Sequence, residues 1–205
     1  MTELFDLLKG NLTEDVIDQL GSQIGSTDRT KTTAAASGAF TVLLDALQRN
    51  ATDKKGVESL NNALEKDHDG SIFDDLMGYV SGNAKQSEKT VNGAGILSHV
   101  LGNKQSGVID LLGKMTGMDS SSSSSLLIKM APLVMGALGK QKKSQNLDTG
   151  GLLDMLTKTV EPERKNSQFG SLLTSVLDRD GDGDVKDDLM SMGMKALSGF
   201  FKKKR

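Results

Sequence analysis

Two aspartate-rich stretches are the parts of this sequence whose residue types and spacing could do chemistry. Residues 178–189 read DRDGDGDVKDDL, and residues 65–76 read EKDHDGSIFDDL. Both place acidic side chains at alternate positions, follow them with glycine, and end in Asp-Asp-Leu. A calcium ion binds six to eight oxygen ligands, and helix–loop–helix calcium sites supply them from carboxylates with this spacing. Calcium binding is therefore the chemistry to consider.

In the second stretch, the calcium-loop pattern assigns carboxylates to its first, third and fifth positions, and three further aspartates follow. The glycine at its sixth position, Gly183, fits the pattern, but the twelfth position is Leu189 where a bidentate carboxylate is expected. One acid comes a residue too early to fill that place. The expected ligands are Asp178, Asp180, Asp182, Asp184 and Asp188.

The first stretch has a poorer ligand set. Only Asp67 and Asp69 are well placed, and Glu65 would have to serve at the first position. His68 lies between the two aspartates, and imidazole together with carboxylates suits zinc or manganese. A single histidine makes a weak site of this kind, so we expect at most weak metal binding here.

A purely structural reading of both stretches is also open. Ser71 and Asp184 each precede an aspartate by three residues, a spacing typical of a helix N-cap with an acidic third residue. Carboxylates are stabilised at the N-terminus of a helix, so such loops need no metal. Against this reading, the four carboxylates between residues 178 and 184 repel one another unless a cation is present.

Composition argues against most catalytic and nucleic-acid-binding classes. The chain of 205 residues has no cysteine, two histidines and a formal net charge of −2. Neither a phosphate-binding loop nor a Gly-x-Ser-x-Gly motif occurs. We therefore expect no enzyme activity, no catalytic residues and no nucleic-acid binding. The basic end, residues 202–205, suits the C-terminus of a helix, and we expect no membrane contact.

Aliphatic residues recur at three- and four-residue spacing along the chain, which predicts helices. Gly10 and Asn11 should interrupt the first of them, with Thr13 as the N-cap of the part that follows. The serine run at 120–125 should begin a helix with a serine cap, although a disordered linker is the alternative. Pro132 should kink its helix or mark the first turn. The expected helices cover residues 3–24, 32–48, 56–64, 72–80, 96–102, 126–138 and 187–201.

Similar segments recur about 92 positions apart. Residues 108–113 (VIDLLG) match residues 16–21 (VIDQLG), and residues 134–138 match residues 43–47. This pattern indicates a duplication. We expect an all-α fold of two similar tandem multi-helix repeats packed into one compact body, with the helices at 32–48 and 125–139 at their interface. The expected division is a first repeat at 1–82, a linker at 83–92, and a second repeat at 93–205.

Four segments resemble a bacterial family of unknown function, DUF937. They are residues 64–76 (LEKDHDGSIFDDL), 95–104 (GILSHVLGNK), 130–140 (MAPLVMGALGK) and 180–189 (DGDGDVKDDL). The resemblance covers nearly the whole chain. It implies a bacterial, all-helical protein, and it supplies no catalytic residues to carry over.

The sequence alone leaves the biological role open. The leading expectation is a non-enzymatic structural or interaction protein of the cytoplasm, stabilised by calcium and acting as a monomer or weak oligomer with an unknown protein partner. One alternative is a calcium- or metal-responsive module that exposes a methionine-rich helix, since methionines adapt to varied partners. An enzyme of unrecognised type is the further alternative.

Overall fold

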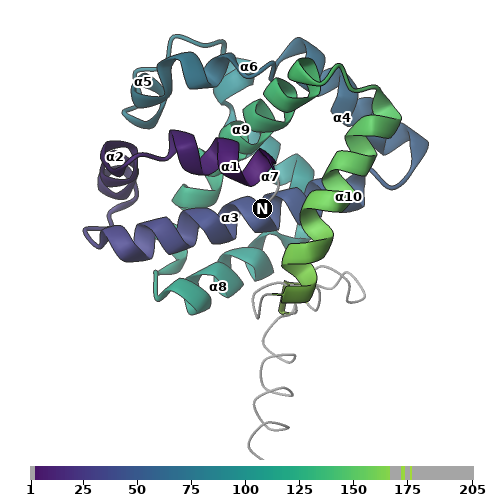
Figure 1. The fold of residues 1–205 in the computed structure, drawn as a ribbon. Coiled ribbons are helices and arrows are strands. Elements are labelled where there is room, and N and C mark those ends of the chain that lie inside the picture. Colours follow the sequence, from purple (N-terminus) through teal and green to yellow (C-terminus); the bar gives the residue numbers. More distant parts are fainter. Residues whose placement is uncertain (1–2, 167–171, 174–175, 177–205) are drawn as a thin grey trace, which may run out of the picture.

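The computed structural model describes residues 3–166, 172–173 and 176. These residues form helices joined by turns, and none of them lies in a β-strand. The fold is therefore all-α, as the sequence predicts (Figure 1). The helix expected at 187–201, the second acidic stretch and the basic end lie outside the described residues.

The N-terminal half contains five α-helices and a 3₁₀ turn in its described part. They are α1 (Glu3–Asn11), α2 (Glu14–Ile24), α3 (Arg29–Asn50), α4 (Lys54–Lys66), the turn η1 (Ser71–Asp75) and α5 (Leu76–Val80). The predicted break between α1 and α2 is confirmed, and the Thr13 hydroxyl caps α2 by accepting a hydrogen bond from the Val16 N–H at 3.4 Å. Asp28 and Asp53 cap α3 and α4 in the same manner.

The C-terminal half continues with further helices. They are α6 (Glu88–Val91), α7 (Gly93–Leu101), the turn η2 (Gly102–Lys104), α8 (Gln105–Thr116), α9 (Ser120–Ser144) and α10 (Thr149–Asn166). The predicted linker at 83–92 therefore contains the short helix α6. Asp119 caps α9 through the Ser122 N–H at 2.9 Å, which is an aspartate cap where we expected a serine.

The two long helices, α3 and α9, pack against each other, and most of the other elements pack against one or both of them (Figure 1). A single hydrophobic cluster draws residues from both halves of the chain, and small residues such as Ala35, Ala39 and Ala137 are fully buried in it. Small side chains let helix backbones approach closely. This explains why two such long helices can share one aliphatic core.

α9 is an apolar helix, and most of its apolar part is buried in the core. It is the helix among the described residues whose length and mean hydropathy (1.2) could span a membrane, and 78% of its apolar window is covered inside the structure. The helix continues past Pro132, which is more than a turn from its start. The proline is therefore not in the first turn, which was one of the two places we expected for it.

Candidate functional site

The first acidic stretch forms a tight turn between α4 and η1. Asp67 ends α4, and its carbonyl oxygen accepts a hydrogen bond from the Thr90 hydroxyl at 2.9 Å, which ties the turn to α6. Gly70 has φ +98°, a conformation that side-chain-bearing residues rarely adopt. The Asp69 carboxylate accepts a hydrogen bond from the Ser71 N–H at 3.1 Å and so holds the turn from within.

Glycines allow this turn to lie directly on α9. A Cβ atom added to Gly139 would lie 1.7 Å from the carbonyl oxygen of His68, and one added to Gly136 would lie 2.5 Å from a methyl group of Ile72. On the loop side, a Cβ atom added to Gly70 would lie 2.6 Å from the Cβ of Lys140. Backbone-to-backbone contact this close requires the absence of side chains. The turn is thus docked on α9 between Gly136 and Lys140.

Lysines of α9 neutralise the acidic side chains of the turn. The Lys142 ammonium lies 2.8 Å from the Glu65 carboxylate, and Lys143 lies 3.8 Å from Asp69. Hydrogen bonding to Lys142 lowers the pKa of Glu65, and the Ser71 N–H lowers the pKa of Asp69. A cleft of about 280 Å³ lies beside these pairs and is lined by both lysines and both acids. Two carboxylates of the first stretch, those of Glu65 and Asp69, therefore already have cationic partners.

His68 is buried at the centre of the turn, with 6% of its surface exposed. Its Nδ1 atom has no hydrogen-bond partner. Burial lowers the pKa of His68, although the Asp67 carboxylate acts in the opposite direction. The imidazole is therefore a buried group whose charged form is disfavoured by its surroundings.

The candidate metal ligands fall into two groups. Asp67 and Asp69 lie in the turn just described, and no group of three or more His, Cys, Asp or Glu residues gathers within the described part of the chain. Asp178, Asp180, Asp182, Asp184 and Asp188 lie outside the described residues. Calcium binding at either stretch stays a prediction.

The helix expected at 72–80 divides in two, and its capping differs from the expectation. Ser71 makes no side-chain cap: the turn η1 begins after Gly70 without one. Asp75 instead caps α5 by accepting a hydrogen bond from the Gly78 N–H at 3.2 Å. The Ser71 N–H bonds to the Asp69 carboxylate, and the 3₁₀ segment η1 precedes the start of α5.

Two further clefts of about 470 Å³ each lie at the C-terminal ends of the long helices. One is formed by the end of α9 with α10 and α1, where the Gln141 side chain donates to the Glu3 carboxylate. The other is formed by the end of α3 with α4 and α7, where the Asn50 side chain donates to the carbonyl oxygen of Val100 at 2.9 Å. In both clefts, an amide side chain of the long helix reaches a helix from the other half of the chain.

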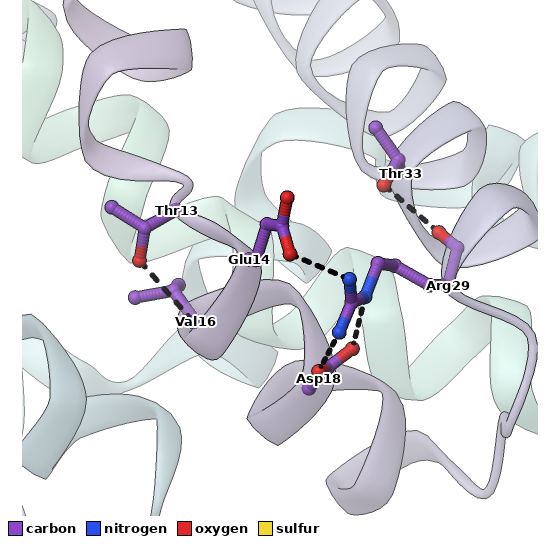
Figure 2. A network of polar contacts seen from close by, with 6 residues as sticks. All are labelled: Thr13, Glu14, Val16, Asp18, Arg29 and Thr33. Atoms are coloured by element: carbon purple, nitrogen blue, oxygen red, sulfur yellow. Dashed lines mark hydrogen bonds and ion pairs between the residues drawn. The ribbon is translucent and has the colours of Figure 1, made fainter.

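A polar network fastens α2 to the start of α3 (Figure 2). The Arg29 guanidinium contacts Glu14 at 2.7 Å and makes a two-pronged contact with Asp18. This bonding lowers the pKa of Asp18. A cation in the first turn of a helix is unfavourable, and the two carboxylates of α2 offset it. The network therefore has a structural task, and no sequence signal beyond charge could have revealed it.

Comparison with known proteins gives one match. Residues 6–141 match the model of a family described as "Bacterial protein of unknown function (DUF937)". The matched region includes the first acidic turn, all of α3, and α9 as far as Gln141. No curated protein and no solved structure matches the chain.

Proposed function

The chain belongs to the DUF937 family of bacterial proteins, and we propose that it acts as a non-enzymatic structural or interaction protein of the cytoplasm. One observation carries this proposal: the first acidic turn is used as a joint. Its backbone packs on a glycine of α9, and two of its carboxylates, Glu65 and Asp69, pair with lysines of that same helix. Acidic residues occupied in this way hold two segments together and are not available to act on a substrate.

We further propose that the body consists of two similar tandem repeats. Matched contacts support this. A Cβ atom added to Gly21 would lie 2.8 Å from the Ser26 carbonyl oxygen, and one added to Gly113 would lie 2.8 Å from the Met118 carbonyl oxygen. These glycines are 92 positions apart. Each also faces a buried hydroxyl residue in the first turn of the next helix, Thr32 in one case and Ser123 in the other.

The packing of the remaining helices follows the same relation. α1, α2 and α4 pack against α9, and their proposed counterparts α7, α8 and α10 pack against α3. α7 and α8 also pack against α9, and α2 also packs against α3, so each repeat would bury its helices on both long helices. Neither repeat would then have a complete core alone, which suits one cooperative body rather than two independent domains.

We also propose that calcium binds the second acidic stretch. Its ligands would be Asp178, Asp180, Asp182, Asp184 and Asp188. The chemical support is the density of carboxylates there, since four of them repel one another without a cation. Asp67 and Asp69 of the first stretch are weaker candidates because lysine already neutralises Asp69. A second candidate function is a calcium-responsive module in which the ion changes exposure of the methionines near the C-terminus, Met190, Met192 and Met194.

A thermal melt with calcium and with chelator tests the calcium proposal. The full chain should melt at a higher temperature in millimolar calcium, because a ligand that binds only the folded state stabilises it. Asp180→Asn combined with Asp182→Asn should abolish the shift, whereas Asp69→Asn should retain it. An unchanged melting temperature in calcium would refute the calcium site. Dye binding that rises with calcium would favour the responsive module over the static scaffold.

A pull-down from the source bacterium with the folded chain as bait addresses the interaction role. Gly139→Ala, which should loosen the docked turn, serves as the matched bait. A partner captured by the native chain and not by this variant would support a role that depends on the assembled body. Turnover of a small molecule by the purified chain would contradict the non-enzymatic proposal.

A further inference from the structure

We propose that two copies of this chain exchange their halves and form a closed dimer, with Asn92 as the hinge. The first half is the described chain up to the end of α6, and the second half is the described chain from the start of α7. In the exchanged form, the first half of one copy packs on the second half of the other copy. The partner is therefore a second copy of this chain, and the surface it uses is the interface that already joins the halves.

The two halves depend on each other for their core. α3 of the first half packs against α7, α8, α9 and α10, and α9 of the second half packs against α1, α2 and α4. One hydrophobic cluster draws its buried residues from both halves. Two copies that exchange halves would make the same contacts between chains instead of within one chain, so the exchange loses little buried surface.

A single residue separates the helices at the boundary between the halves. α6 ends at Val91 and α7 begins at Gly93, so Asn92 alone lies between them. The φ angle of Asn92 is −73°, close to the helical value, whereas its ψ angle is 69° and a helix requires about −42°. A change in this one ψ angle would join α6 and α7 into a continuous helix over residues 88–101.

The buried residues of α6 and α7 already have the spacing of a single helix. Residues three and four positions apart lie on one face of a helix. The buried residues of these two helices follow that spacing across the break, and they are Thr90, Gly93, Leu97, Val100 and Leu101. Asn92 is exposed and lies outside this set. A continuous helix would therefore keep one buried face and would leave Asn92 on the opposite side.

Contacts on each side of Asn92 hold the bent form within one chain. The Thr90 hydroxyl donates to the Asp67 carbonyl oxygen at 2.9 Å, which fixes α6 to the first half. A Cβ atom added to Gly93 would lie 1.8 Å from the Ile128 carbonyl oxygen, so α7 lies directly on α9. Asn92 itself caps α7 by accepting a hydrogen bond from the Gly95 N–H at 2.9 Å. Straightening would turn α6 and α7 away from each other, and each half would then find its complement on a second copy.

Size-exclusion chromatography with light scattering tests the exchange in the full chain. Asn92→Ala removes the capping oxygen and favours a continuous helix, so its elution should shift from monomer to dimer as the protein concentration rises. Asn92→Asp keeps a capping oxygen, and Asn83→Ala changes another exposed asparagine between α5 and α6. Both controls should form no more dimer than the native chain. An Asn92→Ala variant that stays monomeric at millimolar concentration, or an equal dimer fraction in Asn83→Ala, would overturn the proposal.

A cross-link separates exchange of halves from side-by-side association, since the chain has no native cysteine. Glu65→Cys with Lys142→Cys places one thiol on each half, where the native side chains lie 2.8 Å apart. A short bis-maleimide should link these thiols within one chain in the monomer and between chains in the Asn92→Ala dimer, as read by denaturing electrophoresis. Refolding the chain with its native Asn92 from urea at millimolar concentration should also give links between chains, so the test does not depend on the folding of one variant. Links within one chain only, in the dimer or in the refolded sample, would overturn the proposal.

Discussion

Gly139 of α9 and His68 of the first acidic turn are in backbone contact: a Cβ atom added to the glycine would lie 1.7 Å from the histidine carbonyl oxygen. The two residues are far apart in the sequence, and this contact holds the turn on the helix. Since His68 O belongs to the backbone, it cannot rotate away as a flexible side chain would. The loss of stability when Gly139 is replaced by a larger residue therefore measures how closely the turn must dock on the helix.

Gly139→Ala should destabilise the fold. Overpacking a well-packed contact typically costs about 1–3 kcal/mol, and a clash with backbone places this substitution at the upper end or beyond. Gly10→Ala is the matched control, because a Cβ atom there would have nothing within 4 Å. Alanine is a better helix former than glycine by up to about 1 kcal/mol, so the control should be neutral or stabilising. Urea denaturation measures both, and equal midpoints would contradict the docked geometry.

The buried imidazole of His68 should make stability depend on pH. Burial lowers the pKa of His68 in the folded state, so the unfolded chain binds the proton more readily. The stabilisation that this lowered pKa of His68 provides is present above the unfolded pKa of about 6.5. It is lost as pH falls below that value, towards the pKa of His68 in the folded state. The free energy of unfolding, measured between pH 7.5 and 5, should therefore decrease towards acid.

His68→Gln should flatten this part of the pH profile. The chain has two histidines, and His99 is exposed, so His99→Gln is the control that should retain the dependence on pH. If the two variants have the same profile as each other, the burial of His68 is not the cause.

The paired glycines Gly21 and Gly113 should respond alike to substitution. A Cβ atom at either position would lie 2.8 Å from a backbone carbonyl oxygen, so each change to alanine should cost about 1–3 kcal/mol. The exposed neighbours Ser22 and Lys114, changed to alanine, are the controls and should alter the free energy of unfolding little. A large cost at one glycine and none at the other would count against the two-repeat proposal.

The Arg29 network should contribute to thermal stability, and this contribution should be smaller in high salt. Arg29 is half exposed and contacts Glu14 and Asp18, so Arg29→Met should lower the melting temperature at low ionic strength, with a smaller difference in high salt because screening weakens exposed pairs. Lys31→Met removes a cation from the same turn whose nearest carboxylate is 4.0 Å away, and it should have the weaker effect. A difference that does not change with salt would indicate lost packing instead.

Much of the fold can be predicted from local sequence, because hydrophobic spacing and capping residues determine where its helices begin and end. Hydrophobic spacing predicts α1, α2 and α4 closely, and the break before Thr13 follows from Gly10, Asn11 and the capping hydroxyl. α3 is longer than predicted, since Asp28 caps it ahead of the polar first turn, where hydrophobic spacing gives no signal. The serine run joins α9 for the same reason, with Asp119 as its cap.

The geometry of the acidic turn could not be predicted, because its determinants are distant in sequence. Lys142 and Lys143 look like ordinary basic residues near the end of a helix until the fold brings them to Glu65 and Asp69. Gly136 and Gly139 carry no signal of their own that a turn some 70 residues earlier lies on them. The calcium motif was visible from spacing alone, whereas its neutralisation by lysine depends on tertiary contacts.

Tyr79 gives the molecule a built-in optical reporter. It is the chain's one tyrosine, the chain has no tryptophan, and its phenol is 4% exposed and donates a hydrogen bond to the Lys129 carbonyl oxygen at 2.8 Å. This bond joins α5, directly after the acidic turn, to α9. Tyrosine absorbance and emission from the unlabelled protein therefore arise at a single contact between the two halves of the chain. A spectroscopist who follows that signal observes the joining of the halves without introducing a probe.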